Sequence, residues 1–257
     1  DTHSGAITGL TSNPKNHTQE VLLKHYSETL DWMGPVDILI HVADVIDGED
    51  LKSRDIDEEM PEQVEDAANL LKMVRAKEYM LLAGTPYHTA SGATMWDKTV
   101  ASMLKESGKK ATYYTKLKLE LNDWFYLQAR HKIGSSSIPH GRFTAPTKAK
   151  VWDALNSALQ SSRAGTPCKL PHLMVFGHVH YWTYAEDAFG AAMTMPCWQA
   201  PGSKYGDMMC DGHIDLGAVK LFIGDEGEWS WEKKLFVPKV TSRVVKRSKL
   251  IGKKSRK

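Results

Sequence analysis

The sequence predicts an α/β fold, in which buried strands alternate with amphipathic helices. Three observations favour this class: several apolar runs have strand length, segments of helical length separate them, and His or Asp residues follow the strand ends. Hydrophobic residues make up 42% of the 257 residues and charged residues 25%, a globular composition that excludes a disordered, collagenous or coiled-coil chain. A chain of this length buries enough surface to fold without disulfides or a structural metal.

The predicted elements follow one another in an order typical of a layered α/β fold. Apolar runs predict buried strands at 36–43, 78–83, 124–129 and 173–176. Helices are predicted at about 16–33, 61–76, 94–106 and 147–162, and Pro61 is a favourable first helical residue. Short strands joined by tight turns at 191–196, 217–223 and 228–237 indicate antiparallel additions. Because no linker is visible, we expect one domain, residues 1–242, followed by a tail, residues 243–257.

Charge is unevenly distributed along the chain. Residues 243–257 contain eight basic residues and no acidic residue, so the net charge of +2 divides into a tail of +8 and a body of −6. We expect this basic tail to be a solvated, mobile end. Binding of the tail to a nucleic-acid backbone through counterion release is the functional alternative.

The sequence also bears on the cellular compartment. No window approaches the roughly 18 consecutive apolar residues of a transmembrane helix, and the first residues lack the basic-then-apolar pattern of a signal peptide. The cysteines Cys168, Cys197 and Cys210 form no CxxC motif and are odd in number, which favours reduced thiols. We therefore expect a cytoplasmic protein that does not contact membranes.

Side chains with metal-binding chemistry follow the predicted strands. Asp1 and His3 open the chain, and the residues that follow strand ends are Asp44, His88, His131 and the pair His178 and His180. Open α/β sheets place their ligand sites at the C-terminal ends of strands. We therefore expect these side chains to converge at one edge of the sheets.

The spacing of these residues fits a site for two metal ions. In Gly177-His178-Val179-His180 the two histidines are at i and i+2, so along an extended segment both point the same way and can serve different metals. Asp44 carries two carboxylate oxygens that can bridge two cations, and Asp1 and His3 share the i, i+2 spacing. Mixed nitrogen and oxygen ligands suit Mn, Fe or Zn better than Ca or Mg.

The order Asp-x-His, Asp, a Gly-Asn-His-like segment, His and Gly-His-x-His resembles the calcineurin-like metallophosphoesterases, over residues 1–180. The resemblance implies a β-sandwich flanked by helices in four layers, αββα. It also implies roles for the ligands. Asp1, His3 and His180 would hold the first metal, Asp44 would bridge, and His131 and His178 would hold the second.

The segment Gly84-Thr85-Pro86-Tyr87-His88 departs from the Gly-Asn-His of this family. In the family the Asn ligates the second metal and the next His protonates the leaving group. Here Thr85 stands at the Asn position and Pro86 at the His position. His88, two residues further on, is the candidate either for the missing acid or for the missing ligand.

Two further departures concern the ends of the first strands. The Gly-Asp at the bridging position is Ala43-Asp44, which keeps the ligand and changes only the preceding turn. The family also carries a buried strand immediately before Asp-x-His, whereas this sequence begins at Asp1. We therefore expect a sheet that lacks its first strand, as in a trimmed chain or an unusual variant. For the same reason the sequence supports Asp1 as a ligand less firmly than Asp44 or His180.

The resemblance implies hydrolysis of a phosphate monoester or diester by a hydroxide that bridges two metals. We prefer His131 to His140 as a ligand because strand ends are held more rigidly than loops. His140 and Arg142 are then candidates for contacting the substrate phosphate, since a guanidinium can form two hydrogen bonds with it. Arg142 would neutralise charge and His88 would give a proton to the departing oxygen.

Two other functions compete with this one. The altered Gly-Asn-His segment fits a phosphoesterase scaffold that has lost catalysis and serves as a binding module, although the remaining ligand set argues against that. The basic tail fits a nuclease acting on DNA or RNA. The ligand set does not select among these substrates, because the family shares it between monoesterases, diesterases and nucleases.

Overall fold

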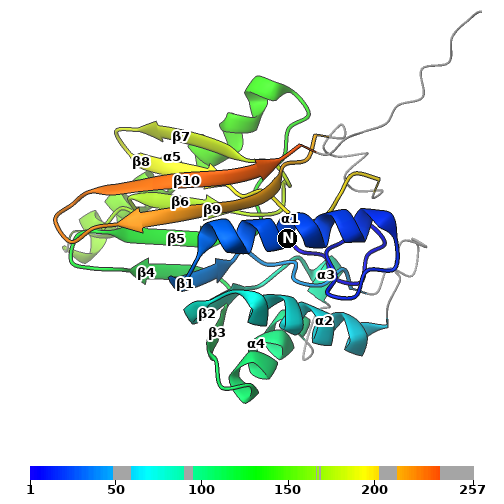
Figure 1. Ribbon diagram of the computed structural model, residues 1–257. Coiled ribbons are helices and arrows are strands. Elements are labelled where there is room, and N and C mark those ends of the chain that lie inside the picture. Colours follow the sequence, from blue (N-terminus) through cyan, green and yellow to red (C-terminus); the bar gives the residue numbers. More distant parts are fainter. Residues whose placement is uncertain (49–58, 90–94, 166, 168, 203–212, 238–257) are drawn as a thin grey trace, which may run out of the picture.

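The computed structural model describes residues 1–48, 59–89, 95–165, 167, 169–202 and 213–237. Within these ranges the strands form three sheets with helices around them (Figure 1). The basic tail 243–257 and the residues Cys168 and Cys210 lie outside the described residues, so the expectations about them stay predictions. No helix of the described ranges combines the length and the apolar character needed to cross a bilayer.

Two of the sheets carry the strands that precede the candidate ligands. The first is parallel and contains, in spatial order, β1 (Val36–His41), β2 (Ala76–Leu82) and β3 (Lys110–Tyr114). The second has the order β4-β5-β6-β8-β7, with bounds β4 (Leu117–Glu120), β5 (Tyr126–Arg130), β6 (Leu173–Phe176), β7 (Thr183–Asp187) and β8 (Gly190–Thr194). In it β5, β6 and β8 are parallel, and the edge strands β4 and β7 are antiparallel to their neighbours.

The third sheet is an antiparallel ribbon of β9 (Leu216–Ile223) and β10 (Trp229–Phe236). The helices are α1 (His17–Met33), α2 (Met60–Met73), the short α3 (Pro86–Thr89), α4 (Trp96–Glu106), a 3₁₀ helix η1 (Pro139–Phe143) and α5 (Thr144–Ala164). Local chemistry explains the ends of α1. The Asn16 side chain accepts the Gln19 amide at its start, and Gly34, with φ of 63°, ends it.

Side-chain alternation along the strands builds four layers. On β2, Tyr79 and Leu81 face a core shared with α1, α2 and α4, whereas Met80 and Leu82 face the second sheet. On β6, Leu173 and Val175 face the first sheet, and the alternate residues Met174 and Phe176 face α5. The order is therefore helices, sheet, sheet, helix, and the expected αββα sandwich is confirmed.

Most predicted elements agree with the structure to within a few residues, and the differences have local causes. The strand predicted from Trp124 begins at Tyr126, because the Asn122 side chain accepts the amides of Trp124 and Phe125 in a turn. The strand predicted at 191–196 ends at Thr194, two residues before Pro196, which has no amide for pairing. Strand β7 was not predicted, because Thr-Tyr-Ala-Glu-Asp is too polar to give a strand pattern.

The outer edge of β1 faces the β9–β10 ribbon across a cavity. This cavity has a volume of about 1020 Å³ and is lined by β1, β9 and one face of α1. Among the described residues β1 pairs only with β2, so no strand occupies the place of the expected first strand. The N-terminal segment instead bonds to the residues that follow β1. The amides of Thr2 and His3 donate to the Asp44 carbonyl, and the amide of Ser4 donates to the Val45 carbonyl.

Candidate metal centre

Most candidate ligands project from tight turns beyond the strand ends, and Asp1 and His3 project from the segment that opens the chain. Five described non-glycine residues have positive φ, and four of them are predicted ligands. The five are His3 (50°), Ala43 (73°), Asp44 (45°), His178 (74°) and His180 (57°). Such backbone conformations are unfavourable for L-residues and concentrate at functional sites, where the surroundings hold them. They turn these side chains out of the strand direction and towards one another.

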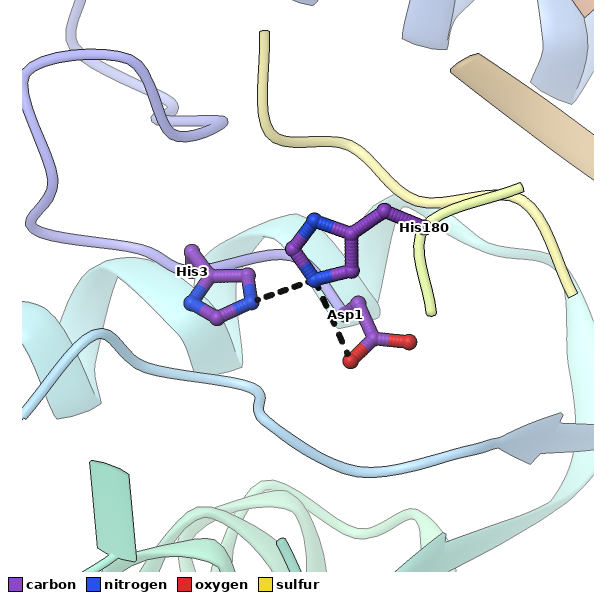
Figure 2. A group of neighbouring side chains, drawn as sticks. All are labelled: Asp1, His3 and His180. Atoms are coloured by element: carbon purple, nitrogen blue, oxygen red, sulfur yellow. Dashed lines mark hydrogen bonds and ion pairs between the residues drawn. The ribbon is translucent and has the colours of Figure 1, made fainter. Parts of the chain in front are cut away.

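Asp1, His3 and His180 form the first group, with one ligand atom from each lying within 4.8 Å of the others (Figure 2). His3 Nε2 lies 3.2 Å from His180 Nε2, which is 3.7 Å from Asp1 Oδ1. Asp1 Oδ1 is buried and accepts no hydrogen bond from the described residues. A buried carboxylate oxygen without a donor is costly, and a cation in this group would satisfy it.

Asp44, His131 and His178 form the second group, again with ligand atoms within 4.8 Å. His131 Nε2 lies 2.8 Å from Asp44 Oδ2, and the rings of His131 and His178 are 5.1 Å apart. Asp44 Oδ1 accepts the Thr85 amide at 2.8 Å. Thr85 therefore reaches Asp44 through its backbone amide.

His88 connects the two groups. One ligand atom each of His3, Asp44 and His88 lie within 4.8 Å, and the rings of His88 and His3 are 4.6 Å apart. His88 Nε2 is 4.0 Å from Asp44 Oδ2. This position fits both a ligand and an acid, so both roles proposed for His88 stay open.

Hydrogen bonds fix which ring nitrogen of three histidines faces the centre. His3 Nδ1 is 3.0 Å from Asp47 Oδ1, His88 Nδ1 is 2.6 Å from the Asp47 carbonyl and His131 Nδ1 is 2.8 Å from the Val42 carbonyl. Carbonyl and carboxylate oxygens only accept, so each Nδ1 carries a proton and the Nε2 of each ring is the nitrogen that faces the centre. Such partners are the usual means by which proteins orient metal-binding imidazoles.

Burial favours the neutral form of three imidazoles of the centre. It lowers the pKa of His3 and His180 well below the ordinary value and, with the neighbouring His131, lowers that of His178 to about 4. Burial opposes ionisation of Asp44 as well, but the His131 ring beside it prevails and brings the pKa of Asp44 below its usual range. Neutral imidazoles and an ionised carboxylate are the protonation states that metal binding requires.

The glycine that precedes His178 is required by crowding. A Cβ at Gly177 would lie 2.7 Å from the Val42 carbonyl oxygen, 2.8 Å from Asp1 Oδ2 and 2.9 Å from His131 Nδ1. These distances are too short for a carbon atom. The Gly-His-x-His motif therefore has a structural basis, because backbone at Gly177 packs directly against two candidate ligands.

Two acidic residues near the centre were missed by the sequence analysis. Asp47 is the partner of His3, and its spacing three residues after Asp44 is the only signal that the sequence offered. Asp97, at the start of α4, is fully buried and accepts the amides of Gly84 at 2.7 Å and Val45 at 3.4 Å. Burial and the nearby Asp44 raise the pKa of Asp97 to about 7.

Arg142 and His140 both lie in η1. The guanidinium of Arg142 lies 4.9 Å over the ring of Tyr181, whose side chain belongs to the core between the second sheet and α5. His140 is exposed. Phosphate contacts by these two residues therefore stay predictions.

No protein-family model matches this sequence, and no curated protein shows significant similarity to it. Among solved structures, the chain is similar to a novel archaeal phosphodiesterase, at 12% identity, 83% coverage of this chain, 93% of the other and a TM-score of 0.43. It is also similar to Vps29 of Entamoeba histolytica complexed with zinc, at 10% identity, 88% and 93% coverage and a TM-score of 0.40. At such values these similarities do not bear on activity, which must be inferred from the side chains described above.

Proposed function

We propose that this protein is a metal-dependent phosphoesterase, hydrolysing a phosphate monoester or diester at a centre for two cations. Asp1, His3 and His180 would hold one cation, His131 and His178 the other, and Asp44 would bridge. The observation that carries this proposal is the convergence of two groups of carboxylate and imidazole side chains. His88 lies between them, close to His3 of the first group and Asp44 of the second. Each group offers both oxygen and nitrogen, which favours Mn, Fe or Zn.

The protein's own residues supply orientation and proton transfer. The two cations, when bound, would provide Lewis acidity that neutralises phosphate oxygens and activates water. Asp1, His3, Asp44, His131 and His180 are buried, whereas His88 and His178 are partly exposed. The substrate would therefore approach from the side of His88 and His178. With its Nδ1 held by the Asp47 carbonyl, His88 would present Nε2 to the departing oxygen and donate a proton there.

A metal analysis and an activity panel test the proposal. The full chain, stripped with a chelator and reloaded with Mn²⁺, is assayed on a nitrophenyl phosphate monoester, a nitrophenyl diester and single-stranded DNA. We expect two equivalents of Mn²⁺ and hydrolysis of at least one ester, abolished in Asp44→Asn. The matched control is Asp66→Asn, because Asp66 is also buried but pairs with Ser12. Retention of no cation, or equal activity in Asp44→Asn and the parent, contradicts the proposal.

The leaving group separates the two roles proposed for His88. If His88 is the acid, His88→Ala lowers turnover of phenyl phosphate far more than that of nitrophenyl phosphate, whose leaving oxygen needs no proton. Its affinity for Mn²⁺ then stays within twofold of the parent. If His88 is a ligand, the affinity falls and both substrates slow equally.

A binding module is the second candidate, and Thr85-Pro86 in place of Asn-His is the observation that favours it. This alternative predicts that the protein turns over none of the three substrates and need not retain two cations. A nuclease instead predicts that single-stranded DNA is the best of the three.

A further inference from the structure

Asp97 is a buried carboxyl group that the chemistry above does not use. It is fully buried, and in the described part of the chain its two hydrogen-bond donors are backbone amides rather than basic side chains. Burying a carboxyl group without a basic partner costs stability, so its presence calls for a specific role.

The two amides belong to the two loops that approach the bridging carboxylate. Val45 directly follows Asp44 in the loop after β1, and Gly84 directly precedes Thr85 in the loop after β2. Thr85 in turn donates its amide to Asp44 Oδ1 at 2.8 Å. A single side chain on α4 therefore holds both loops at the point where they meet around Asp44.

The backbone beside Asp97 requires such support. Ala43 and Asp44 have φ of 73° and 45°, conformations that persist only where neighbouring groups fix them. The carbonyl of Asp44 is fixed by the amides of Thr2 and His3, and its carboxylate by that of Thr85. The amide of Val45, which belongs to the same peptide unit as the Asp44 carbonyl, is fixed by Asp97.

We propose that Asp97 is a positioning residue of the metal centre, which fixes Asp44 and the Thr85–His88 segment by accepting the amides of Val45 and Gly84. This inference rests on the proposed metal centre and deepens it. Asp97 contacts neither cation nor substrate. Its effect passes through two backbone hydrogen bonds and is therefore expected in metal affinity before it is expected in chemistry.

The test compares Asp97→Asn with Asp66→Asn in the full chain. Asp66 is likewise buried and accepts a backbone amide, that of Ser12 at 2.7 Å, but it lies on α2. By calorimetric titration with Mn²⁺, we expect Asp97→Asn to weaken affinity at least about tenfold, as loss of outer partners of metal ligands commonly does. Asp66→Asn is expected to stay within twofold of the parent. Parent-like affinity in Asp97→Asn, or an equal loss in Asp66→Asn, overturns the inference.

A measurement on the unaltered protein decides the matter even if Asp97→Asn fails to fold. Addition of Mn²⁺ should slow amide hydrogen exchange at Val45 and Gly84 at least about tenfold, because the cations would fix the loops that Asp97 holds. Exchange at Ser12, bonded to Asp66, should not change. Unchanged exchange at Val45 and Gly84 in a protein that binds Mn²⁺ overturns this inference alone. A parent protein that binds no Mn²⁺ overturns the proposed function with it.

Discussion

Four of the six predicted ligands have strained backbone conformations, which elsewhere in the described chain are confined to glycine and Ala43. Positive φ at a non-glycine residue costs about 1–2 kcal/mol, and His3, Asp44, His178 and His180 share this property. Backbone hydrogen bonds hold them in place, such as the Asp215 amide on the His180 carbonyl and the Ala6 amide on the His3 carbonyl. The side chains are therefore aimed at the centre by the fold itself, which lowers the ordering cost of binding cations.

The crowding at Gly177 gives a testable prediction about the positions of the ligands. In Gly177→Ala, the added Cβ must displace the Val42 carbonyl, Asp1 or His131, each within 2.9 Å of it. We expect a loss of about 1–3 kcal/mol in the free energy of unfolding, by overpacking, together with weaker Mn²⁺ binding. Urea denaturation and calorimetric titration measure the two effects. Gly134→Ala is the matched control, since a Cβ there would meet only Ala145, at an ordinary 3.6 Å. Equal effects of the two substitutions would refute the explanation.

Asp97 provides a pH-dependent prediction for the metal-free protein. Its pKa of about 7 exceeds the ordinary 3.8, so between these values the folded chain keeps a proton that the unfolded chain has released. Stability contributed by protonated Asp97 is therefore present at low pH and is lost as pH rises to about 7. Asp97→Asn cannot ionise, so from pH 5 to pH 8 its stability should improve on that of the parent by about 3 kcal/mol. Urea denaturation at several pH values measures this, and parallel curves for the two proteins would contradict it.

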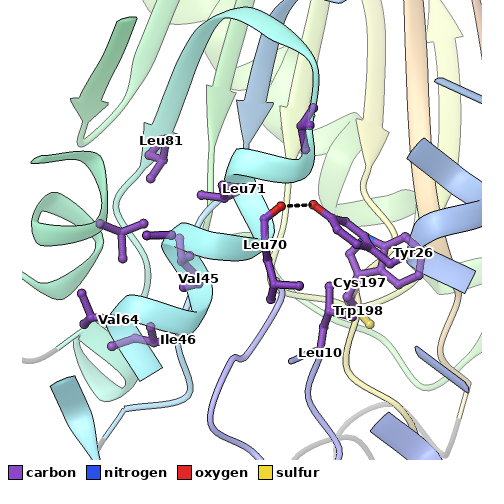
Figure 3. Close-up of a cluster of buried hydrophobic side chains, with 14 of the residues drawn as sticks. Leu10, Tyr26, Val45, Ile46, Val64, Leu70, Leu71, Leu81, Cys197 and Trp198 are labelled. Atoms are coloured by element: carbon purple, nitrogen blue, oxygen red, sulfur yellow. Dashed lines mark hydrogen bonds between the residues drawn. The ribbon is translucent and has the colours of Figure 1, made fainter. Parts of the chain in front are cut away.

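At the scale of secondary-structure elements, Tyr26 joins α1 to the end of α2 (Figure 3). Its hydroxyl donates to the Leu70 carbonyl at 2.9 Å, and its ring meets that of Trp198 edge-on. Leu70 is among the last four residues of α2, whose carbonyls lack partners within the helix. Tyr26→Phe should therefore destabilise the protein by about 1–3 kcal/mol, because it leaves this carbonyl unsatisfied. Urea denaturation tests it, with Mn²⁺ affinity as the control that should not change.

The helices and strands that could be predicted are those whose conformation follows from the pattern of their own residues. Strand β6 is apolar on both faces because sheets and helix cover it, and a short apolar run is visible without any tertiary knowledge. Strand β7 is different. It is polar, partly exposed and held by pairing with β8, so its conformation depends on a neighbour rather than on its own pattern.

The candidate site divides in the same way. Four of the six predicted ligands follow strand ends, whereas Asp1 and His3 open the chain. The structure brings all six together, although their metal-binding roles stay predictions. Asp97 was missed because it acts on a backbone amide 52 residues away, a contact that only the packing of α4 creates. For Arg142 the residue type was predictable but the direction of its side chain was not, because the position of η1 depends on the core that contains Tyr181.

At the scale of the whole molecule, the centre lies where the two central sheets meet. Asp44 and Thr85 follow strands of the first sheet, whereas His131, His178 and His180 follow strands of the second. The group of Asp44, His131 and His178 draws on both sheets, and its His131 Nε2 lies 2.8 Å from Asp44 Oδ2. Cations bound there would link the two halves of the sandwich, in addition to the apolar core between them.

Metal removal tests this linkage. A ligand that binds only the folded state at one hundred times its Kd stabilises it by about 2.7 kcal/mol, which for a chain of this size raises Tm by about 5–10 °C. We expect a shift of this size between the chelated and the Mn²⁺-loaded protein in a thermal melt. Asp44→Asn should lose most of the shift, because it removes the carboxylate that follows the first sheet and contacts His131 of the second. Asp66→Asn should keep the full shift, although it should melt at a lower temperature both with and without Mn²⁺. Equal melting temperatures with and without Mn²⁺ in the parent would mean that no cation links the sheets.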